Sequence, residues 1–244
     1  MKPGEVKAAM ICGIALGLGL GAALLRGADP VAPGEAEGGL ALQATNLPLR
    51  QVSAAVFEIG GVRLNKKLKT AQFDTQVNMN QGAIEYLLVS TAGKLHESLL
   101  RTTIEPEHLH VAMLLLGAQG AAPEAADVTG AETPVRILAN WQTDAGEQAR
   151  PVEDWVLNKT TGAPMERGPW TYLGSKIIHG TFMAQRERSL VAIMTDPFAL
   201  IGNPKPGHEN DKIWSPRTAE VPPVGTPVRI TIQLEMRQEK QGSP

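Results

Sequence analysis

Residues 82–117 read GAIEYLLVSTAGKLHESLLRTTIEPEHLHVAMLLLG, and this stretch decides which fold the sequence predicts. Ile84–Ser90 is apolar on both faces except for Glu85, as expected of a buried strand. Ala92-Gly93 supplies turn chemistry, so we expect an antiparallel hairpin whose second strand is Leu95–Thr103. The centre of the chain is therefore predicted to consist of paired strands.

A helix is predicted directly after this hairpin, over Pro106–Leu116. Proline suits the first turn of a helix, and Gly117 suits the residue that follows its end. The residues after Leu109 are apolar almost all round. We therefore expect the helix to be buried against a sheet.

Further strands are predicted on both sides of this stretch. In Thr70–Met79 the apolar residues Ala71, Phe73, Val77 and Met79 alternate with polar ones, a period of two that is typical of a half-buried strand. Turn residues separate the later segments at the spacing of a sandwich or barrel. We expect a mainly β fold, an antiparallel β-sandwich or partly open barrel with one short buried helix. Its later strands are predicted at Val135–Trp141, Val152–Leu157, Trp170–Ile178, Thr181–Gln185, Leu190–Met194 and Val228–Leu234.

The stretch at residues 82–117 resembles the YdjY-domain family of exported bacterial proteins. The later segments WTYLGS at 170–175, TDPFALI at 195–201 and VPPVGTPVRITI at 221–232 are similar to members from planctomycete-like bacteria. The resemblance spans about residues 50–236 and implies export and a single β-rich domain. It brings no established catalytic residues. Some relatives carry a ferredoxin-type iron–sulfur label, which this chain does not match for want of cysteines.

The N-terminus has the order of a secretory signal peptide. Lys2 and Lys7 precede an uncharged run, Ala8–Leu25, rich in Ala, Leu and Gly. We expect a cleaved signal peptide over residues 1–28, a flexible linker over 29–48, one domain over 49–238 and a disordered tail over 239–244. The alternative is an uncleaved anchor, since the 18 residues of the run reach the lower limit for spanning a bilayer. The predicted location is the periplasm or another exported compartment.

Cys12, the single cysteine of the chain, lies within this leader. A cleaved mature chain would contain no thiol, which excludes disulfides, a cysteine nucleophile and an iron–sulfur cluster. The net charge of −2, without a basic stripe, gives no electrostatic support for binding nucleic acid. Lys66, Lys67 and Lys69 are interpreted as a solvated turn. We expect no cofactor, with a divalent metal as the alternative.

Residues able to do acid–base or metal chemistry concentrate between Glu85 and His110. In a hairpin with a two-residue turn, Glu85 and His96 share a face but lie about 13 Å apart along the ladder. One residue more or fewer in the loop exchanges the faces and brings Glu85 within reach of Glu97. The catalytic candidates are Glu85, His96 and Glu97, and the metal candidates are His96 and His110. The more ordinary interpretation of Glu85 is a buried carboxyl tied to Lys94, Arg101 or backbone amides.

His108 and His110 cannot chelate one ion together, because side chains two residues apart on a helix point about 200° apart. The function predicted is therefore that of an exported cell-envelope protein, a non-catalytic binding or structural module with an envelope partner or small ligand. The alternative is a metal-dependent hydrolase that uses His96 with Glu97 or Glu85. Contact with the membrane is expected only through an uncleaved leader.

Overall fold

The computed structural model describes residues 48–121 and 131–235. The predicted signal peptide, nearly all of the predicted linker and the tail at 239–244 lie outside this part of the chain. Contacts group residues 38–244 into one compact unit, which holds every described residue. None of the helices described is long and apolar enough to cross a bilayer.

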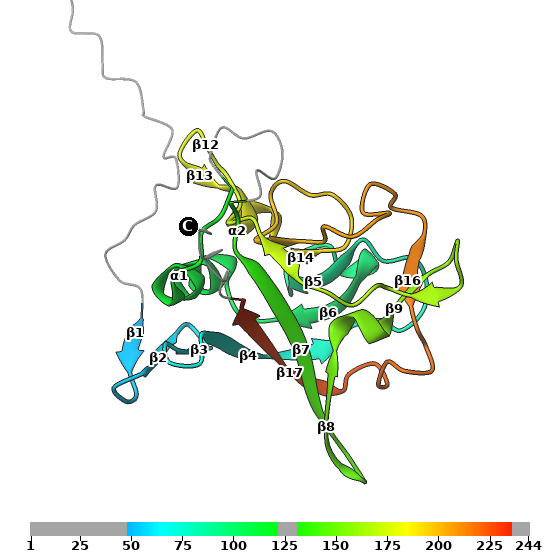
Figure 1. Ribbon diagram of the computed structural model, residues 1–244, viewed down its shortest axis with the longest axis horizontal. Coiled ribbons are helices and arrows are strands. Elements are labelled where there is room, and N and C mark those ends of the chain that lie inside the picture. Colours follow the sequence, from blue (N-terminus) through cyan, green and yellow to red (C-terminus); the bar gives the residue numbers. More distant parts are fainter. Residues whose placement is uncertain (1–47, 122–130, 236–244) are drawn as a thin grey trace, which may run out of the picture. The chain divides into compact units, whose positions relative to one another are not determined.

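Eight strands form a closed barrel (Figure 1). Their bounds, in the order of pairing, are β4 (Thr70–Val77), β17 (Pro227–Leu234), β7 (Pro134–Thr143), β11 (Trp170–Tyr172), β15 (Ile201–Gly202), β14 (Ser189–Ala192), β5 (Tyr86–Ser90) and β6 (Ser98–Thr102). The pairing of β6 with β4 closes the ring. The prediction of a mainly β fold is confirmed. Of the two architectures expected, the sheet forms the barrel, which is closed rather than partly open, and two of its strand pairs are parallel.

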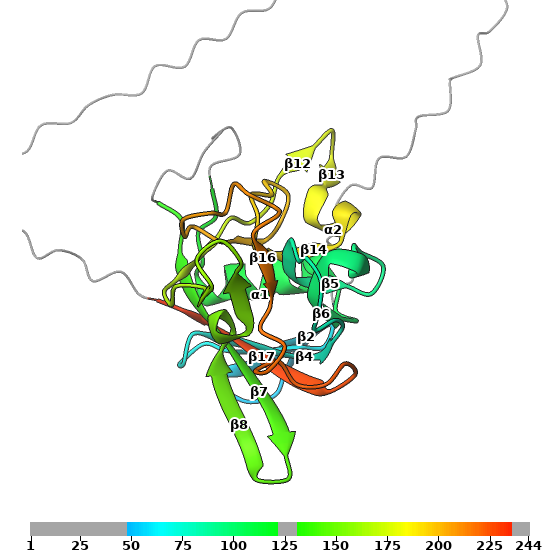
Figure 2. The ribbon, with the colours of Figure 1, turned by 90° about the vertical axis from the view of Figure 1, so that its right-hand side faces the viewer.

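Additional strands extend the barrel sheet at two places. β1 (Leu49–Gln51), β2 (Val56–Ile59) and β3 (Val62–Asn65) continue it beyond β4. β8 (Gly146–Pro151) pairs with β7, and this hairpin projects beyond the barrel (Figure 2). Two small sheets lie outside the main one, formed by β9 (Val156–Asn158), β10 (Ala163–Pro164) and β16 (Trp214–Pro216), and by β12 (Ile177–Ile178) and β13 (Thr181–Phe182).

The predicted helix is confirmed as α1 (Pro106–Leu116). Gly117 follows it with a positive φ of 93°, and its N–H bonds back to the helix, as a C-terminal glycine does. The ammonium group of Lys69 donates to the carbonyl oxygen of Leu116 at 2.8 Å, which satisfies one of the free carbonyls at the helix end. The local sequence signals of this helix were therefore sufficient to locate both of its ends.

The burial of α1 differs from the prediction. Leu109, Ala112 and Met113 are buried against the sheet extension of β2, β3 and β4. Leu114 and Leu115, however, are 50% and 37% exposed. The helix is buried against a sheet as predicted, but Leu114 and Leu115 are not, because the sheet covers only one side of it.

The predicted antiparallel hairpin at Ala92-Gly93 was also wrong. β5 and β6 are parallel, with Tyr86 opposite Ser98. Leu95–Glu97 forms the 3₁₀ turn η1 instead of the start of a strand. The chain thereby returns to the beginning of β5, and β6 enters the barrel between β5 and β4.

Other predicted strands are shorter or are replaced by helical turns. The segment predicted over Val152–Leu157 begins as the 3₁₀ helix η2 (Val152–Trp155). The strand predicted over Thr181–Gln185 gives way to the helix α2 (Met183–Glu187). The strand predicted over Trp170–Ile178 is split, because Gly174 and Ser175 both have positive φ. At the first two sites a helical turn replaces extended pairing, and at the third the backbone turns out of the strand.

Candidate functional site

Glu85 and Glu97 are brought together at the start of the two parallel strands. Each residue directly precedes its strand, and the N–H of Glu85 donates to the carbonyl oxygen of Glu97 at 2.9 Å. Burial raises the pKa of Glu85, and the neighbouring carboxylates of Glu97 and Asp211 raise it further, while Lys94 opposes them. Of the two pairings left open by the sequence, the structure has Glu85 beside Glu97, through parallel rather than antiparallel strands.

Lys94, Tyr86 and Asp196 form a chain of polar contacts next to this pair. The Lys94 ammonium group donates to the Tyr86 hydroxyl at 2.9 Å, and that hydroxyl donates to Asp196 at 3.1 Å. Nζ of Lys94 also lies 3.8 Å from Oε1 of Glu97. Burial raises the pKa of Tyr86, and the hydrogen bond to Tyr86 raises that of Lys94. At neutral pH this chain therefore holds a charged lysine and a neutral phenol.

His96 lies at the edge of this cluster with 80% of its side chain exposed. Its Nε2 is 3.6 Å from Oε2 of Glu97, so the imidazole is accessible and has one carboxylate beside it. In the described ranges, no group of three or more His, Cys, Asp or Glu side chains is arranged to hold a metal ion. The use of His96 with Glu97 or Glu85 in a hydrolase remains a prediction.

His110 occupies a different place, on the side of α1 that faces β11 and β13. Its Nδ1 is hydrogen-bonded to the Tyr172 hydroxyl at 2.7 Å, and the centroid of its ring lies 4.8 Å from that of Phe182. Burial lowers the pKa of His110 to about 4, so the ring is neutral at physiological pH. The structure thus separates His110 from the residues around Glu85.

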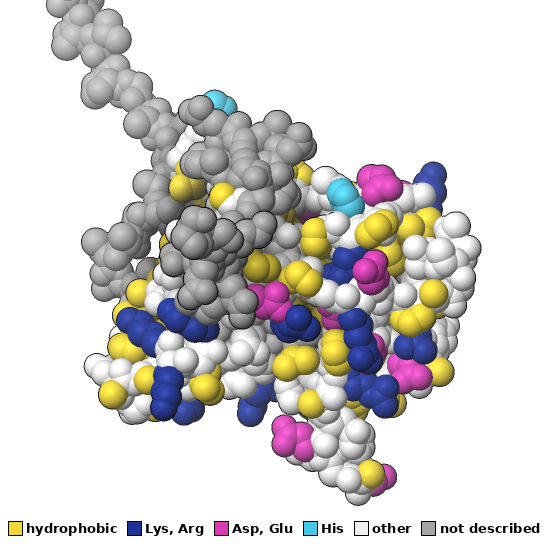
Figure 3. All heavy atoms as spheres, viewed as in Figure 1, with side chains coloured by type: hydrophobic (Ala, Val, Ile, Leu, Met, Phe, Trp, Pro, Cys, Tyr) yellow, Lys and Arg dark blue, Asp and Glu magenta, His cyan; other side chains and the backbone are white. Residues whose placement is uncertain are grey.

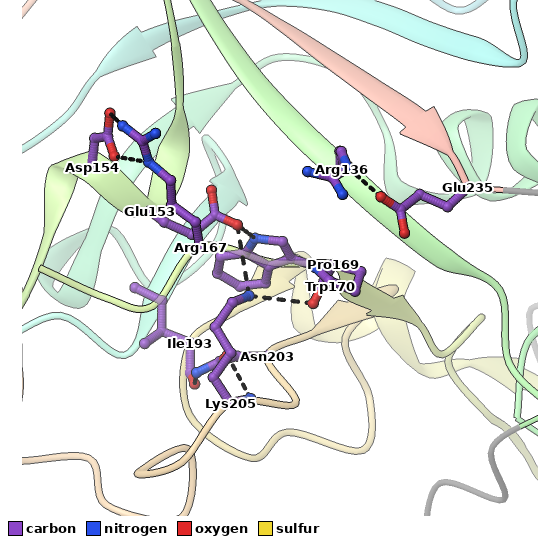
Figure 4. A network of polar contacts seen from close by, with 10 residues as sticks. All are labelled: Arg136, Glu153, Asp154, Arg167, Pro169, Trp170, Ile193, Asn203, Lys205 and Glu235. Atoms are coloured by element: carbon purple, nitrogen blue, oxygen red, sulfur yellow. Dashed lines mark hydrogen bonds and ion pairs between the residues drawn. The ribbon is translucent and has the colours of Figure 1, made fainter.

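A buried polar network involves the loop that follows β15 and was missed by the sequence analysis (Figure 4). Nζ of Lys205 is 3.7 Å from Oε1 of Glu153, which also accepts from Nε1 of Trp170 at 3.0 Å. The ammonium group lies 4.5 Å from the centroid of the Trp170 ring and donates to the carbonyl of Pro169. Burial lowers the pKa of Lys205. The network ties the loop after β15 to η2 and β11.

Asp154, next to Glu153, continues this network toward the surface. Arg167 donates to both of its carboxylate oxygens, at 2.8 and 2.7 Å, in a two-pronged contact. Asn203 anchors the loop from the other side by donating to the carbonyl of Ile193 at 3.0 Å. Because every charged group here already has a partner within the protein, we assign the network to stability rather than to ligand binding.

A groove of about 470 Å³ lies where the β7–β8 hairpin leaves the barrel. Arg229 of β17 is paired across the sheet with Asn140 of β7 and with Asp74 of β4. Gln142 lies two residues beyond Asn140 and is paired with Glu147 of β8. Since alternate residues of a strand point to the same side, these five polar residues share the outer face of the sheet.

Two contacts shape the groove. Nε of Arg229 donates to Oδ1 of Asp74 at 3.1 Å, an exposed pair among the lining residues. Trp141 alternates to the inner face, where its ring meets the buried Trp155 edge-on at 5.1 Å between centroids. This packing holds the base of the projecting hairpin. The Glu147 carboxylate has no ion-pair partner among the described residues, so it is available to a ligand.

The family comparison agrees with the fold. The model of the YdjY domain matches residues 62–233, which is well over half of the chain. The chain belongs to the YdjY-domain family. The match begins at the first residue of β3 and ends one residue before the end of β17. The YdjY domain therefore supplies the barrel, and β1 and β2 precede the matched region. No curated protein and no solved structure matches the chain.

Proposed function

We propose that this YdjY-domain protein is an exported cell-envelope binding module, and that the groove beside the β7–β8 hairpin is its binding surface. The observation that carries the proposal is the row of Asp74, Arg229, Asn140, Gln142 and Glu147 along one face of four neighbouring strands. Rigid strands place these groups better than a loop would.

The chemistry of the lining favours a ligand rich in hydroxyl and amide groups. Asn140 and Gln142 each offer an amide that both donates and accepts, and Glu147 offers two acceptor oxygens. The Arg229–Asp74 pair retains further donors and acceptors at its edges. Polysaccharide and peptide groups of a cell wall have this composition. The lining also contains Trp141, Pro227 and Val228, on which the apolar face of a sugar ring can pack. The proposed ligand is therefore a cell-wall polymer rather than a nucleic acid.

The binding proposal predicts that Asn140→Ala combined with Gln142→Ala weakens binding to delipidated, protein-free cell wall by about 10- to 30-fold, because each lost hydrogen bond is worth about 1 kcal/mol. Sedimentation of the mature chain with this material measures the effect. Gln148→Ala is the matched control, since Gln148 pairs with Trp141 and lies on the opposite face of the hairpin. If the control loses as much binding as the double variant, the groove is not the binding surface.

Export is supported by the order of charges and apolar residues at the N-terminus. We expect the mature protein to begin between Ala22 and Asp29, because small residues suitable for signal peptidase occur there. Intact-mass analysis of the protein recovered from the envelope fraction tests this. An intact Met1 in that fraction would mean that the leader is retained as an anchor and is not cleaved. Recovery of the full chain from the cytoplasm alone would contradict export.

A further inference from the structure

Exposed apolar side chains concentrate on one end of the molecule, away from the groove. Among the described residues, eight large apolar side chains are exposed, and five of them belong to the segment around β1, the β3–β4 turn or α1. Leu68 in the turn is 59% exposed, and Leu114 and Leu115 on α1 are 50% and 37% exposed. Such clustering marks interaction sites more often than scattered single residues do.

Lysines surround the exposed Leu68. Lys66, Lys67 and Lys69 flank it in the turn between β3 and β4, and none of their ammonium groups pairs with a carboxylate in the part of the chain that the structure describes. In Figure 3, dark-blue and yellow side chains are interspersed over this end of the molecule. The Lys66 ammonium group lies 4.8 Å from the centroid of the Phe57 ring. Three positive charges without a carboxylate partner therefore accompany the leucines, although the whole chain has a net charge of −2.

The turn has a fixed shape and abuts the helix. The Asn65 side-chain oxygen accepts from the N–H groups of Lys67 and Leu68, at 3.0 and 3.1 Å. Lys69 reaches the carbonyl oxygen of Leu116, so the turn meets the C-terminal end of α1, where Leu114 and Leu115 lie. The role of Lys69 is to cap the C-terminal end of the helix. This role accounts for neither the charge of Lys67 nor the exposure of Leu68.

We propose that this basic–apolar surface, formed by Lys66, Lys67, Leu68, Leu114 and Leu115, docks the domain on a lipid bilayer that contains anionic lipids. Lysines attract the negative headgroups, and the leucines between them enter the boundary of the acyl chains.

Charge favours a membrane over a second copy of the chain as the occupant. Two copies meeting through this surface would place their uncompensated lysines against each other, which is unfavourable. An anionic bilayer is complementary to them. The docking surface is independent of the proposed groove, which lies at the β7–β8 hairpin.

The test uses the chain from Asp29 onward, which contains the entire compact unit 38–244 but not the apolar leader. It should sediment with vesicles of phosphatidylcholine and phosphatidylglycerol, and not with phosphatidylcholine alone. Lys66→Gln with Lys67→Gln should lower the partition coefficient by about fivefold per lysine, hence roughly 30-fold. Leu68→Ser should lower it about tenfold, because its apolar burial is lost.

Lys159→Gln with Lys212→Gln is the matched control, since it removes two exposed lysines near β9 and β16. It should leave the partition coefficient unchanged, and thermal melting should show that all variants fold. The proposal is overturned if the parent chain stays in solution with the anionic vesicles, or if the control loses as much binding as the Lys66/Lys67 variant. It is also overturned if the Leu68→Ser variant binds the anionic vesicles as well as the parent chain does. The same holds if the parent chain forms a dimer, does not bind vesicles, and loses the dimer on Leu68→Ser.

Discussion

Replacing Lys205 with methionine is expected to lower the free energy of unfolding by about 3–5 kcal/mol. The side chains of Lys205 and Glu153 are only 8% and 4% exposed. Methionine fills much of the same volume but leaves the Glu153 carboxylate buried without its cation. Urea denaturation of the two proteins at neutral pH measures the difference.

The surface pair Arg136–Glu235, drawn in the same view, provides the control (Figure 4). Arg136→Met should cost less than about 1 kcal/mol, because the arginine side chain is 60% exposed and water replaces its partner. Adding Glu153→Gln to Lys205→Met should restore part of the loss. Glutamine removes the uncompensated charge and still accepts from Trp170. A loss from Lys205→Met no larger than that from Arg136→Met would show that the buried pair does not support the fold.

Local signals in the sequence were sufficient for α1 and β4. Pro106 and Gly117 act within a few residues of themselves, so both ends of the helix were predictable. The alternation through Ala71 and Phe73 likewise reports the two faces of a strand wherever it pairs. The mainly β class followed from several such segments.

Features that depend on distant residues were not predictable in this way. The Ala92-Gly93 turn suggested a hairpin, but the direction of β6 is set by its place between β5 and β4. The exposure of Leu114 depends on which side of α1 the sheet covers. The approach of Glu85 to Glu97 was foreseen only as one of two registers, since strand pairing rather than composition decides it.

The groove and the buried network were not predictable for the same reason, since each brings together residues that are distant in the sequence. Each groove residue occupies an ordinary exposed strand position, and only the pairing of β4, β17, β7 and β8 places the five side by side. Lys205 lies between Pro204 and Pro206, where the sequence indicates only a loop. Its burial follows from the position of Glu153 in η2, which no local pattern around Lys205 indicates.

The turn between β2 and β3 is locked against a histidine of α1. Gly60 and Gly61 both have positive φ, 51° and 87°, and Ile59 pairs with Val62 across this two-residue turn. A Cβ added to Gly60 would lie 1.8 Å from Nδ1 of His108, well inside van der Waals contact. Glycine at this position therefore serves both the turn and the docking of the helix on the hairpin.

Gly60→Ala is accordingly expected to lower the free energy of unfolding by about 2–5 kcal/mol. About 1–2 kcal/mol comes from placing a Cβ in the left-handed region, and about 1–3 kcal/mol from displacing His108. Gly180→Ala is the control, because Gly180 has φ 77° in a comparable turn, with no atom near the added Cβ. It should show the backbone cost alone. In a His108→Ala background, the further cost of Gly60→Ala should fall to the Gly180 value, as measured by denaturation of all four proteins of the cycle. If that cost were unchanged without the imidazole, the helix would not depend on this glycine for its docking.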